Sequence, residues 1–199
     1  MRIVCLDLEG VLVPEIWVAL ANRTQIKELL LTTRDIEDYD ELMSLRLKVI
    51  EKEGLTIEDI HNSVKTLDPF DGAKSFLNKL TEDYQVIILS DTFYEIAQPL
   101  FQKLGFPNVF CHHLQISKKG IIEGYKLRLK DQKRKAVEAF QNLGFSVSAA
   151  GDSYNDLGML EAADIGVLFR APNFLIKKYK LFSNTNNYEE LYSLLRGMD

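Results

Sequence analysis

The sequence predicts an α/β fold in which a three-layer, doubly wound (Rossmann-like) parallel sheet forms the core and a small helical cap is inserted after the first strand. Three observations support this prediction. Short apolar runs alternate with amphipathic helical stretches, one long segment near the N-terminus has helical periodicity only, and 199 residues with 46% hydrophobic content are enough to bury a sizeable core. We therefore expect a core domain made of residues 1–14 and 68–199 and a cap domain made of residues 15–67.

Five apolar runs with high strand propensity predict the sheet. They comprise residues 2–6, 85–89, 108–111, 145–150 and 164–169. Runs that are apolar throughout are typical of strands with both faces buried, as in a parallel sheet that helices cover on each side.

Amphipathic helices are predicted between these strands. After Asp71, Asp91 and Asp131, apolar residues recur at helical spacing, and each Asp stands where a helix N-cap is expected. A further amphipathic stretch around residues 191–195 is expected to close the core. The alternation of strand and helix is that of a doubly wound sheet.

Two segments depart from this alternation. Residues 15–67 contain no strand candidate but include a capping-box pattern at Thr56 and Asp59, so they are expected to form helices, with Trp17 packing their interior. Residues 114–129 alternate between polar and apolar side chains around a Lys-Lys-Gly sequence, which predicts a β-hairpin flap.

Charge and composition argue against several classes of protein. The 24 basic and 29 acidic residues give a net charge of −5, which does not suit a surface for nucleic acid or anionic lipid. No apolar run approaches the length of a membrane span, and the N-terminal run is too short for a signal peptide, so neither membrane insertion nor secretion is expected. Cys5 and Cys111 cannot form a disulfide framework, which favours a cytoplasmic location.

Polar residues gather where ligands bind in open α/β sheets, beyond the carboxyl ends of the strands. They are Asp7 and Glu9 after the first predicted strand, Ser90 and Asp91 after the second, and Asp152, Asn155 and Asp156 after the fourth. Lys133 lies in the first turn of a helix whose apolar stripe faces the sheet, so its ammonium group can reach the same edge. Each residue alone has an ordinary explanation as a turn residue, a cap or a solvated lysine. Their convergence on one edge favours a catalytic site.

This combination of side chains predicts phosphoryl transfer. Several carboxylates in one place repel each other unless a hard cation binds among them, and Mg²⁺ is the expected ion. Ser90, Lys133 and the backbone N–H groups that open the next helix can bind phosphate oxygens. Asp7 can then attack phosphorus to give an aspartyl-phosphate, and Glu9 can protonate the leaving oxygen.

Competing chemistries have little support. The sequence contains no Gly-rich dinucleotide motif, no P-loop and no Gly-x-Ser-x-Gly elbow, and neither cysteine is followed six positions later by an arginine. His61 stands alone, and the neighbouring His112 and His113 are expected to point to opposite faces of a strand, which does not suit a zinc site.

Four motifs of this chain resemble, in the same order, those of the haloacid dehalogenase superfamily: Asp7-x-Glu9-Gly10, Ser90, Lys133 and Gly151-Asp152-x-x-Asn155-Asp156. Within that superfamily, nearly the whole chain resembles the bacterial phosphoserine phosphatase/homoserine phosphotransferase group. The resemblance implies phosphoserine as substrate, homoserine as a candidate second acceptor, and leaves a homodimer open.

The resemblance also implies a role for each site residue. Asp7 would be the nucleophile and Glu9 the acid/base, Mg²⁺ would be bound by Asp7, Glu9 and Asp152, phosphate by Ser90 and Lys133, and the amino acid by Glu15, Arg46, Asp91 and Asn155. Two of these positions depart from the usual pattern. Other superfamily phosphatases have Asp at the position of Glu9, so its backbone carbonyl is the safer metal ligand, and phosphoserine phosphatases usually have Gly at the position of Asp91.

Arg46 interrupts an apolar stripe within the predicted cap. The stripe comprises Tyr39, Leu42, Met43, Arg46, Val49 and Ile50. Arg46 either extends to solvent or pairs with an acid, or it points from the cap toward the site to bind a carboxylate or phosphate. Glu15 is either an ordinary acid at a helix start or the partner of an ammonium group.

Three functions are therefore considered. The first is a Mg²⁺-dependent phosphotransferase for small phosphorylated amino acids, phosphoserine foremost. The second is a phosphatase of another small phosphomonoester, such as a nucleotide or sugar phosphate. The third is a phosphate-sensing binding protein, against which Asp7 argues because a binding protein needs no nucleophile.

Overall fold

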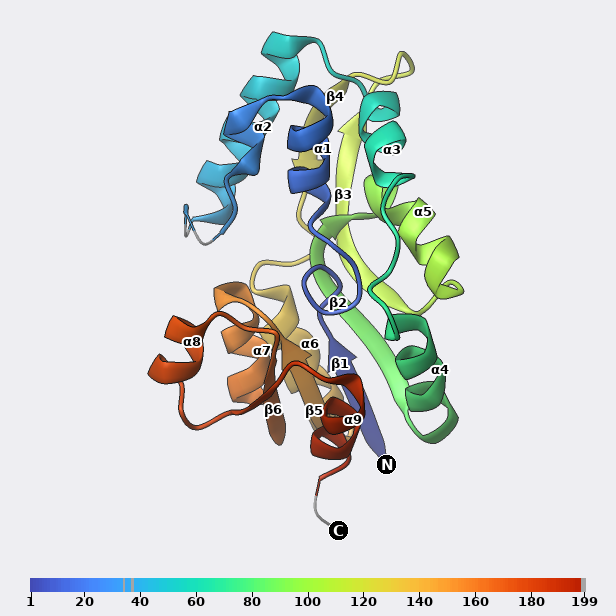
Figure 1. The fold of residues 1–199 in the computed structure, drawn as a ribbon, viewed down its shortest axis with the longest axis vertical. Helices are drawn as coiled ribbons and strands as arrows, with labels where there is room; N and C mark the ends of the chain where they lie inside the picture. Colours follow the sequence, from blue (N-terminus) through green and yellow to red (C-terminus); the bar gives the residue numbers. More distant parts are fainter. Residues whose placement is uncertain (34, 37, 198–199) are drawn as a thin grey trace.

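The computed structural model describes residues 1–33, 35–36 and 38–197 and has a mixed sheet at its centre (Figure 1). Across the sheet the strands follow the order β4-β3-β2-β1-β5-β6-β7. They are β1 (Arg2–Leu6), β2 (Gln85–Phe93), β3 (Val109–Ile116), β4 (Ile122–Lys126), β5 (Ser146–Gly151), β6 (Ile165–Phe169) and β7 (Ser183–Thr185). All neighbouring pairs are parallel except β3 and β4, which confirms the predicted doubly wound α/β fold.

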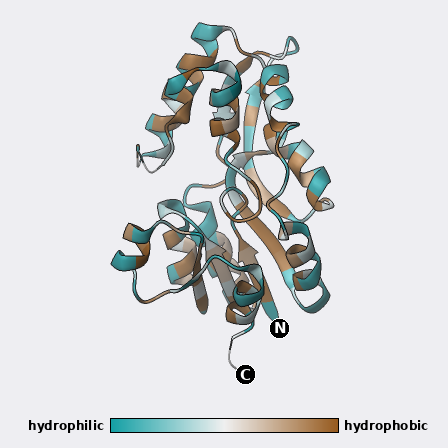
Figure 2. Ribbon diagram, viewed as in Figure 1, coloured by the Kyte–Doolittle hydropathy of each residue, from teal (hydrophilic) through white to brown (hydrophobic). Residues whose placement is uncertain are grey.

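Helices cover both faces of this sheet. Along β1, Val4 and Leu6 belong to one buried cluster and Ile3 and Cys5 to the other, because successive side chains of a strand point to opposite faces. One face is covered by α4 (Ala73–Asp83), α5 (Tyr94–Leu104) and α9 (Tyr188–Arg196), and the other by α6 (Gln132–Asn142), α7 (Leu157–Ala162) and α8 (Asn173–Lys178). Figure 2 shows hydrophobic residues concentrated in the central strands and hydrophilic residues on the outer helices. Within the described part of the chain, no helix is both long enough and apolar enough to cross a bilayer.

The segment between β1 and α4 is helical, as expected. It comprises α1 (Ile16–Thr24), the 3₁₀ helix η1 (Lys27–Leu30), α2 (Tyr39–Glu53) and α3 (Ile57–Val64). The predicted capping box at Thr56 and Asp59 is present at the start of α3. Trp17 is buried inside this insert, with the Arg46 guanidinium 4.6 Å above its ring. The insert lies over the C-terminal end of β1, where the predicted site is located (Figure 1).

The predicted hairpin is formed by β3 and β4. It extends β3 well past the expected strand end at residue 111. At its tip, the Ile57 N–H donates a hydrogen bond of 2.9 Å to the Gly120 carbonyl, so the hairpin contacts the insert. No feature of the sequence predicted this contact, which supports the insert from the side of the core.

Two of the three predicted N-cap assignments are wrong, and the third, Asp131, is confirmed in position. Helix α4 begins after Gly72 rather than Asp71, and α5 begins after Phe93 rather than Asp91. Asp131 is the N-cap residue of α6, as predicted, although it has φ 54° and its side chain accepts no cap hydrogen bond. The error at Asp91 arises because β2 continues through Phe93, so Asp91 lies within a strand at the sheet edge.

Candidate active site

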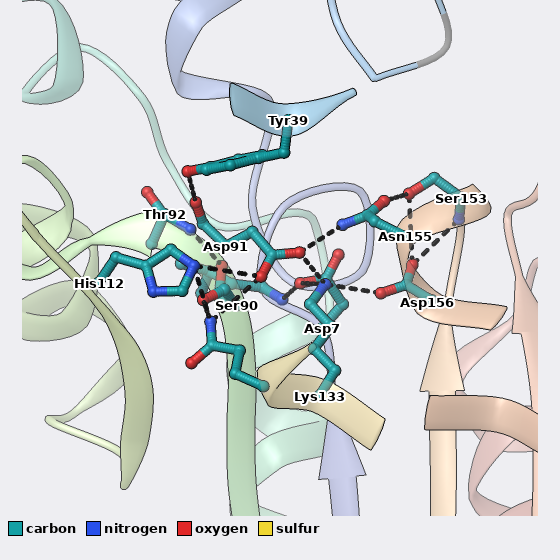
Figure 3. A network of polar contacts seen from close by, with 12 residues as sticks. Asp7, Tyr39, Ser90, Asp91, Thr92, His112, Lys133, Ser153, Asn155 and Asp156 are labelled. Carbon is teal, nitrogen blue, oxygen red and sulfur yellow. Dashed lines mark hydrogen bonds and ion pairs between the residues drawn. The ribbon is translucent and has the colours of Figure 1, made fainter. Parts of the chain in front are cut away.

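A small cavity of about 60 Å³ lies at the C-terminal edge of the sheet, between the core and the insert. The residues that the sequence predicted and that line it are Asp7, Glu9, Glu15, Arg46, Ser90, Asp91, Asp152 and Asn155. Lys133, the remaining predicted residue, lies next to Asp7, with its Nζ 3.0 Å from Asp7 Oδ1 (Figure 3). The structure thus brings all the predicted site residues together.

Lys133 is buried among three carboxylates. Its Nζ lies 2.7 Å from Asp156 Oδ1, 3.0 Å from Asp7 Oδ1 and 3.5 Å from Asp91 Oδ2. Burial works to lower the pKa of Lys133, but the charges of Asp156, Asp7 and Asp91 outweigh it and hold that pKa well above its usual value. Lys133 is therefore a permanent cation beneath the pocket.

Asp156 fixes the loop that follows β5. One of its carboxylate oxygens accepts from the N–H groups of Asp152 and Ser153, at 2.9 and 3.0 Å, and the other accepts from Lys133. A Cβ at Gly151 would lie 2.3 Å from Asp156 Cγ, so only glycine permits this close approach. Asp156 therefore uses both oxygens to position its neighbours.

Asp91 is the centre of a second polar network. Asn155 Nδ2 donates to its Oδ2 at 3.0 Å, Gln132 Nε2 donates to its Oδ1 at 3.1 Å, and His112 Nε2 lies 3.5 Å from Oδ1. Burial alone would raise the pKa of Asp91, but Lys133 and these hydrogen bonds hold it well below its usual range. Asp91 is therefore an anion at neutral pH.

Several residues of this region were not predicted as site residues, among them Tyr39, Thr92, His112 and Gln132. His112 is buried and His113 is exposed, which confirms that they face opposite sides of β3, but nothing in the sequence indicated that His112 would reach Asp91. The Tyr39 hydroxyl donates to the Asp91 carbonyl at 2.7 Å and links the insert to the core. Tyr39 shares the helical stripe of Arg46, and this was a signal that could have identified it.

Carboxylates converge on a place suited to a metal ion. Asp7, Asp152 and Asp156 each offer an oxygen within 4.8 Å of the others. Burial and the charge of Asp156 raise the pKa of Asp7 well above its usual value, although the charge of Lys133 opposes this. A cation among these hard oxygen donors would relieve the repulsion, and oxygen donors suit Mg²⁺. A Cβ at Gly10 would lie 2.4 Å from Asp152 Cγ, so glycine is what lets Asp152 approach the loop after β1.

The Glu9 side chain does not join this carboxylate cluster. Its Oε2 accepts from the Ile16 N–H at 2.8 Å, at the start of the insert. Burial raises the pKa of Glu9, and the Ile16 N–H, Glu15 and Arg46 oppose that rise. The Glu9 side chain is thus oriented toward the insert side of the pocket. An acid/base group there would contact the part of a substrate that is bonded to the phosphate.

The insert contributes a cation to the same pocket. Arg46 is 5% exposed, its Nη2 donates to the Leu31 carbonyl at 2.9 Å, and its Nε has no partner among the described residues. Burial lowers the pKa of Arg46, while the charges of Glu9, Tyr39 and Glu15 act against this. Of the three interpretations considered for Arg46, extension to solvent is therefore wrong.

Comparisons with known proteins agree with this arrangement. A family model for haloacid dehalogenase-like hydrolases matches residues 1–164. The chain is 52% identical over 191 residues to a Pseudomonas aeruginosa protein called phosphoserine phosphatase ThrH, covering 96% of this chain and 93% of that protein. It is 50% identical over 191 residues to a phosphoserine phosphatase of Pseudomonas syringae, covering 96% and 81%. The apo crystal structure of a phosphoserine phosphatase superposes with a TM-score of 0.78 at 19% identity and covers 99% of this chain and 98% of that one.

Proposed function

The chain belongs to the haloacid dehalogenase-like hydrolases, and from that premise we propose that it is a phosphoserine phosphatase that works through an aspartyl-phosphate on Asp7. One observation carries the proposal. The buried Asp7 carboxylate lies at a pocket whose insert side presents both a cation, Arg46, and an anion, Glu15. A zwitterionic amino acid attached to phosphate matches that distribution of charge.

Phosphoryl transfer would proceed in two steps. An Asp7 oxygen forms a bond to phosphorus, the bond from phosphorus to the serine oxygen breaks, and that oxygen takes a proton from Glu9. Burial raises the pKa of Glu9, which favours the protonated form that this step requires. In the second step Glu9 removes a proton from water, the water oxygen forms a bond to phosphorus, and the bond from phosphorus to the Asp7 oxygen breaks, which releases inorganic phosphate and regenerates Asp7.

A metal ion fits the carboxylate cluster. Asp7, Asp152 and the Glu9 backbone carbonyl would hold Mg²⁺, and the ion would neutralise charge on the phosphate. Lys133 and Ser90 bind phosphate oxygens from the core side, with Lys133 kept charged by its three carboxylate neighbours. Asp156 holds both Lys133 and the loop that carries Asp152 in place.

Recognition of the amino acid would depend on the insert, which we propose acts as a cap (residues 15–67) over a core of residues 1–14 and 68–199. Arg46 would bind the substrate carboxylate and Glu15 its ammonium group, while Asp91 and Asn155, hydrogen-bonded to each other, form the opposite wall. The homodimer and the cytoplasmic location stay predictions.

Transfer to homoserine is the finer part of the proposal. Homoserine has the charged groups of serine and a hydroxyl one methylene farther out, so it could occupy the same pocket after serine leaves. Orientation beside Glu9 would let it compete with water for the aspartyl-phosphate. Incubation of the enzyme with phosphoserine and homoserine, followed by ³¹P NMR, should reveal phosphohomoserine at the expense of inorganic phosphate. Inorganic phosphate as the sole product would leave a simple phosphatase.

The central test is phosphate release from a panel of phosphoserine, phosphothreonine, nucleotide monophosphates and sugar phosphates, with Mg²⁺ or with EDTA. We expect phosphoserine to have the highest kcat/KM, EDTA to abolish turnover, and Asp7→Asn to abolish it without unfolding the protein. A higher kcat/KM for a nucleotide or sugar phosphate would instead support the alternative substrate class. Turnover by Asp7→Asn at the wild-type rate would contradict the mechanism.

A further inference from the structure

Two buried polar side-chain atoms have no hydrogen-bond partner within the described part of the chain: Arg46 Nε and Thr92 Oγ1. Both residues line the active-site pocket. A buried polar group without a partner costs free energy, and native proteins keep few of them without a function. Substrate binding accounts for Arg46, but the proposed mechanism gives the Thr92 hydroxyl no role.

The fold does not require this hydroxyl. Thr92 is 3% exposed and lies near the end of β2, where a β-branched residue is favoured. Valine would provide the same shape and the same preference for a strand. It would also avoid burial of a hydroxyl that makes no hydrogen bond of normal geometry within the described part of the chain, although it lies near the Glu9 carboxylate. The hydroxyl is therefore the part of Thr92 that the fold leaves unexplained.

The position of Thr92 indicates what its hydroxyl could bind. Its backbone N–H donates to Ser90 Oγ at 3.3 Å, on the side of the pocket where phosphate binds in the proposed mechanism. Its hydroxyl is close enough to the Glu9 carboxylate to be among the groups that oppose the burial-induced rise in the pKa of Glu9. Thr92 thus lies between the phosphate-binding side and the acid/base. The ester oxygen must occupy the same place, because it is bonded to phosphorus and exchanges a proton with Glu9.

We propose that the Thr92 hydroxyl hydrogen-bonds the alcohol oxygen of the substrate and so positions that oxygen between phosphorus and Glu9. This inference rests on the proposed function. When the bond from Asp7 to phosphorus forms and the ester bond breaks, the electron pair stays on the alcohol oxygen, which takes its proton from Glu9. Thr92 keeps its own proton and donates a hydrogen bond to the oxygen on which charge develops. In the reverse direction it orients the hydroxyl of an attacking water or alcohol.

Such a residue selects for esters of aliphatic alcohols. An alkoxide is a poor leaving group, and it depends on hydrogen bonding and protonation as the ester bond breaks. A nitrophenolate leaves without either. The hydrogen bond from Thr92 should therefore matter for phosphoserine and matter less for p-nitrophenyl phosphate, when kcat/KM is compared for the two substrates.

Two matched variants test the proposal. Thr92→Val keeps the shape and removes the hydroxyl, so we expect kcat/KM for phosphoserine to fall about tenfold, the effect of one neutral hydrogen bond worth about 1.4 kcal/mol. The fall for p-nitrophenyl phosphate should be smaller, and the melting temperature should stay the same or rise, since a buried hydroxyl without a partner is removed. Thr92→Ser keeps the hydroxyl and loses a buried methyl, so it should keep most of the activity and melt at a lower temperature.

The outcomes separate this inference from the proposed function. Failure of the wild-type protein to hydrolyse phosphoserine would overturn the proposed function and the inference with it. If the wild type hydrolyses phosphoserine and Thr92→Val does so equally well, only the role of Thr92 is wrong. Equal losses on both substrates for Thr92→Val would show that the hydroxyl does not act on the leaving oxygen. A Thr92→Ser variant as impaired as Thr92→Val would show that the hydroxyl alone does not support activity, and either result would overturn the role of Thr92.

Discussion

Replacement of Lys133 by methionine tests the electrostatic basis of the site. Methionine has a similar length but no charge, so Lys133→Met would leave the carboxylates of Asp7, Asp156 and Asp91 without the cation that lies 2.7 to 3.5 Å from them. Removal of one partner from a buried ion pair typically destabilises a protein by about 3–5 kcal/mol, because the remaining charge is buried and uncompensated. We expect a loss of this size in the free energy of unfolding at pH 7, together with loss of phosphatase activity.

The loss should also depend on pH. In the wild type the pKa of Asp7 is already raised above its usual value of 3.8, and removal of the opposing Lys133 charge would raise it further. An acid whose pKa is higher in the folded state than in the unfolded state opposes folding while it is charged, and this penalty disappears as the pH falls through the folded-state pKa. The difference in stability between wild type and Lys133→Met should therefore narrow as the pH falls from 7 through the folded-state pKa of Asp7 in the variant.

Urea unfolding followed by circular dichroism, in EDTA, measures both effects. The matched control is Lys135→Met on the same helix, where the side chain is exposed and the expected change is within about 0.5 kcal/mol. A loss below about 1 kcal/mol for Lys133→Met, the size typical of a surface ion pair, would refute the reasoning. So would a loss of stability that does not change as the pH is lowered from 7.

Three further predictions concern neighbouring residues. Burial would raise the pKa of Asp91, but Lys133 and hydrogen bonds lower it. The Asp91 carboxylate should therefore stabilise the protein above pH 4 and lose that contribution as the pH falls through its folded-state pKa. In urea titrations, the free energy of unfolding of Asp91→Asn should depend less on acid pH than that of the wild type. Arg46→Ala should raise KM for phosphoserine by about tenfold or more, the effect of one charged hydrogen bond, and change KM for p-nitrophenyl phosphate much less, whereas equal changes would make Arg46 structural. Gly10→Ala places a Cβ 2.4 Å from Asp152 Cγ, at a backbone φ of +79° that alanine rarely adopts. The variant should therefore have a lower melting temperature and need a higher Mg²⁺ concentration for half-maximal activity. Wild-type values of both quantities would contradict the role of this glycine.

Topology explains why most of the site could be predicted from sequence. Asp7, Ser90 and Asp152 each follow or end a strand with an apolar pattern, and the strands β1, β2 and β5 are parallel neighbours. Their carboxyl ends must therefore meet at one edge, whatever the side-chain details. Lys133 could be placed there because helical periodicity shows which face of its helix turns inward.

The C-terminal end of β2 and the partners of Asp91 could not be predicted from the sequence. Both depend on β3, a strand distant in the sequence. Beyond Leu89, β2 shifts register against β3 and then pairs Phe93 with His112, so the strand continues where its own sequence suggested a helix cap. The same pairing brings His112 toward Asp91. A periodic pattern reports which side of an element is buried, but it carries no information on which residue of another strand lies opposite.

The charges in the pocket also bear on how the proposed reaction is possible. Asp7, Asp91 and Asp156 surround a single Lys133, and Asp152 adds another acid at the same edge, so the core side of the site is predominantly anionic in the described structure. An anionic phosphate would be repelled from this edge by Coulomb forces that are strong where water is excluded. Lys133 cannot offset that repulsion alone, because the same acids already pair with it. The acidity of the core side therefore supports a bound cation as a condition for substrate binding. On this basis EDTA should weaken the binding of phosphoserine to Asp7→Asn, which cannot turn it over, and calorimetric affinity that is unchanged by EDTA would contradict the argument.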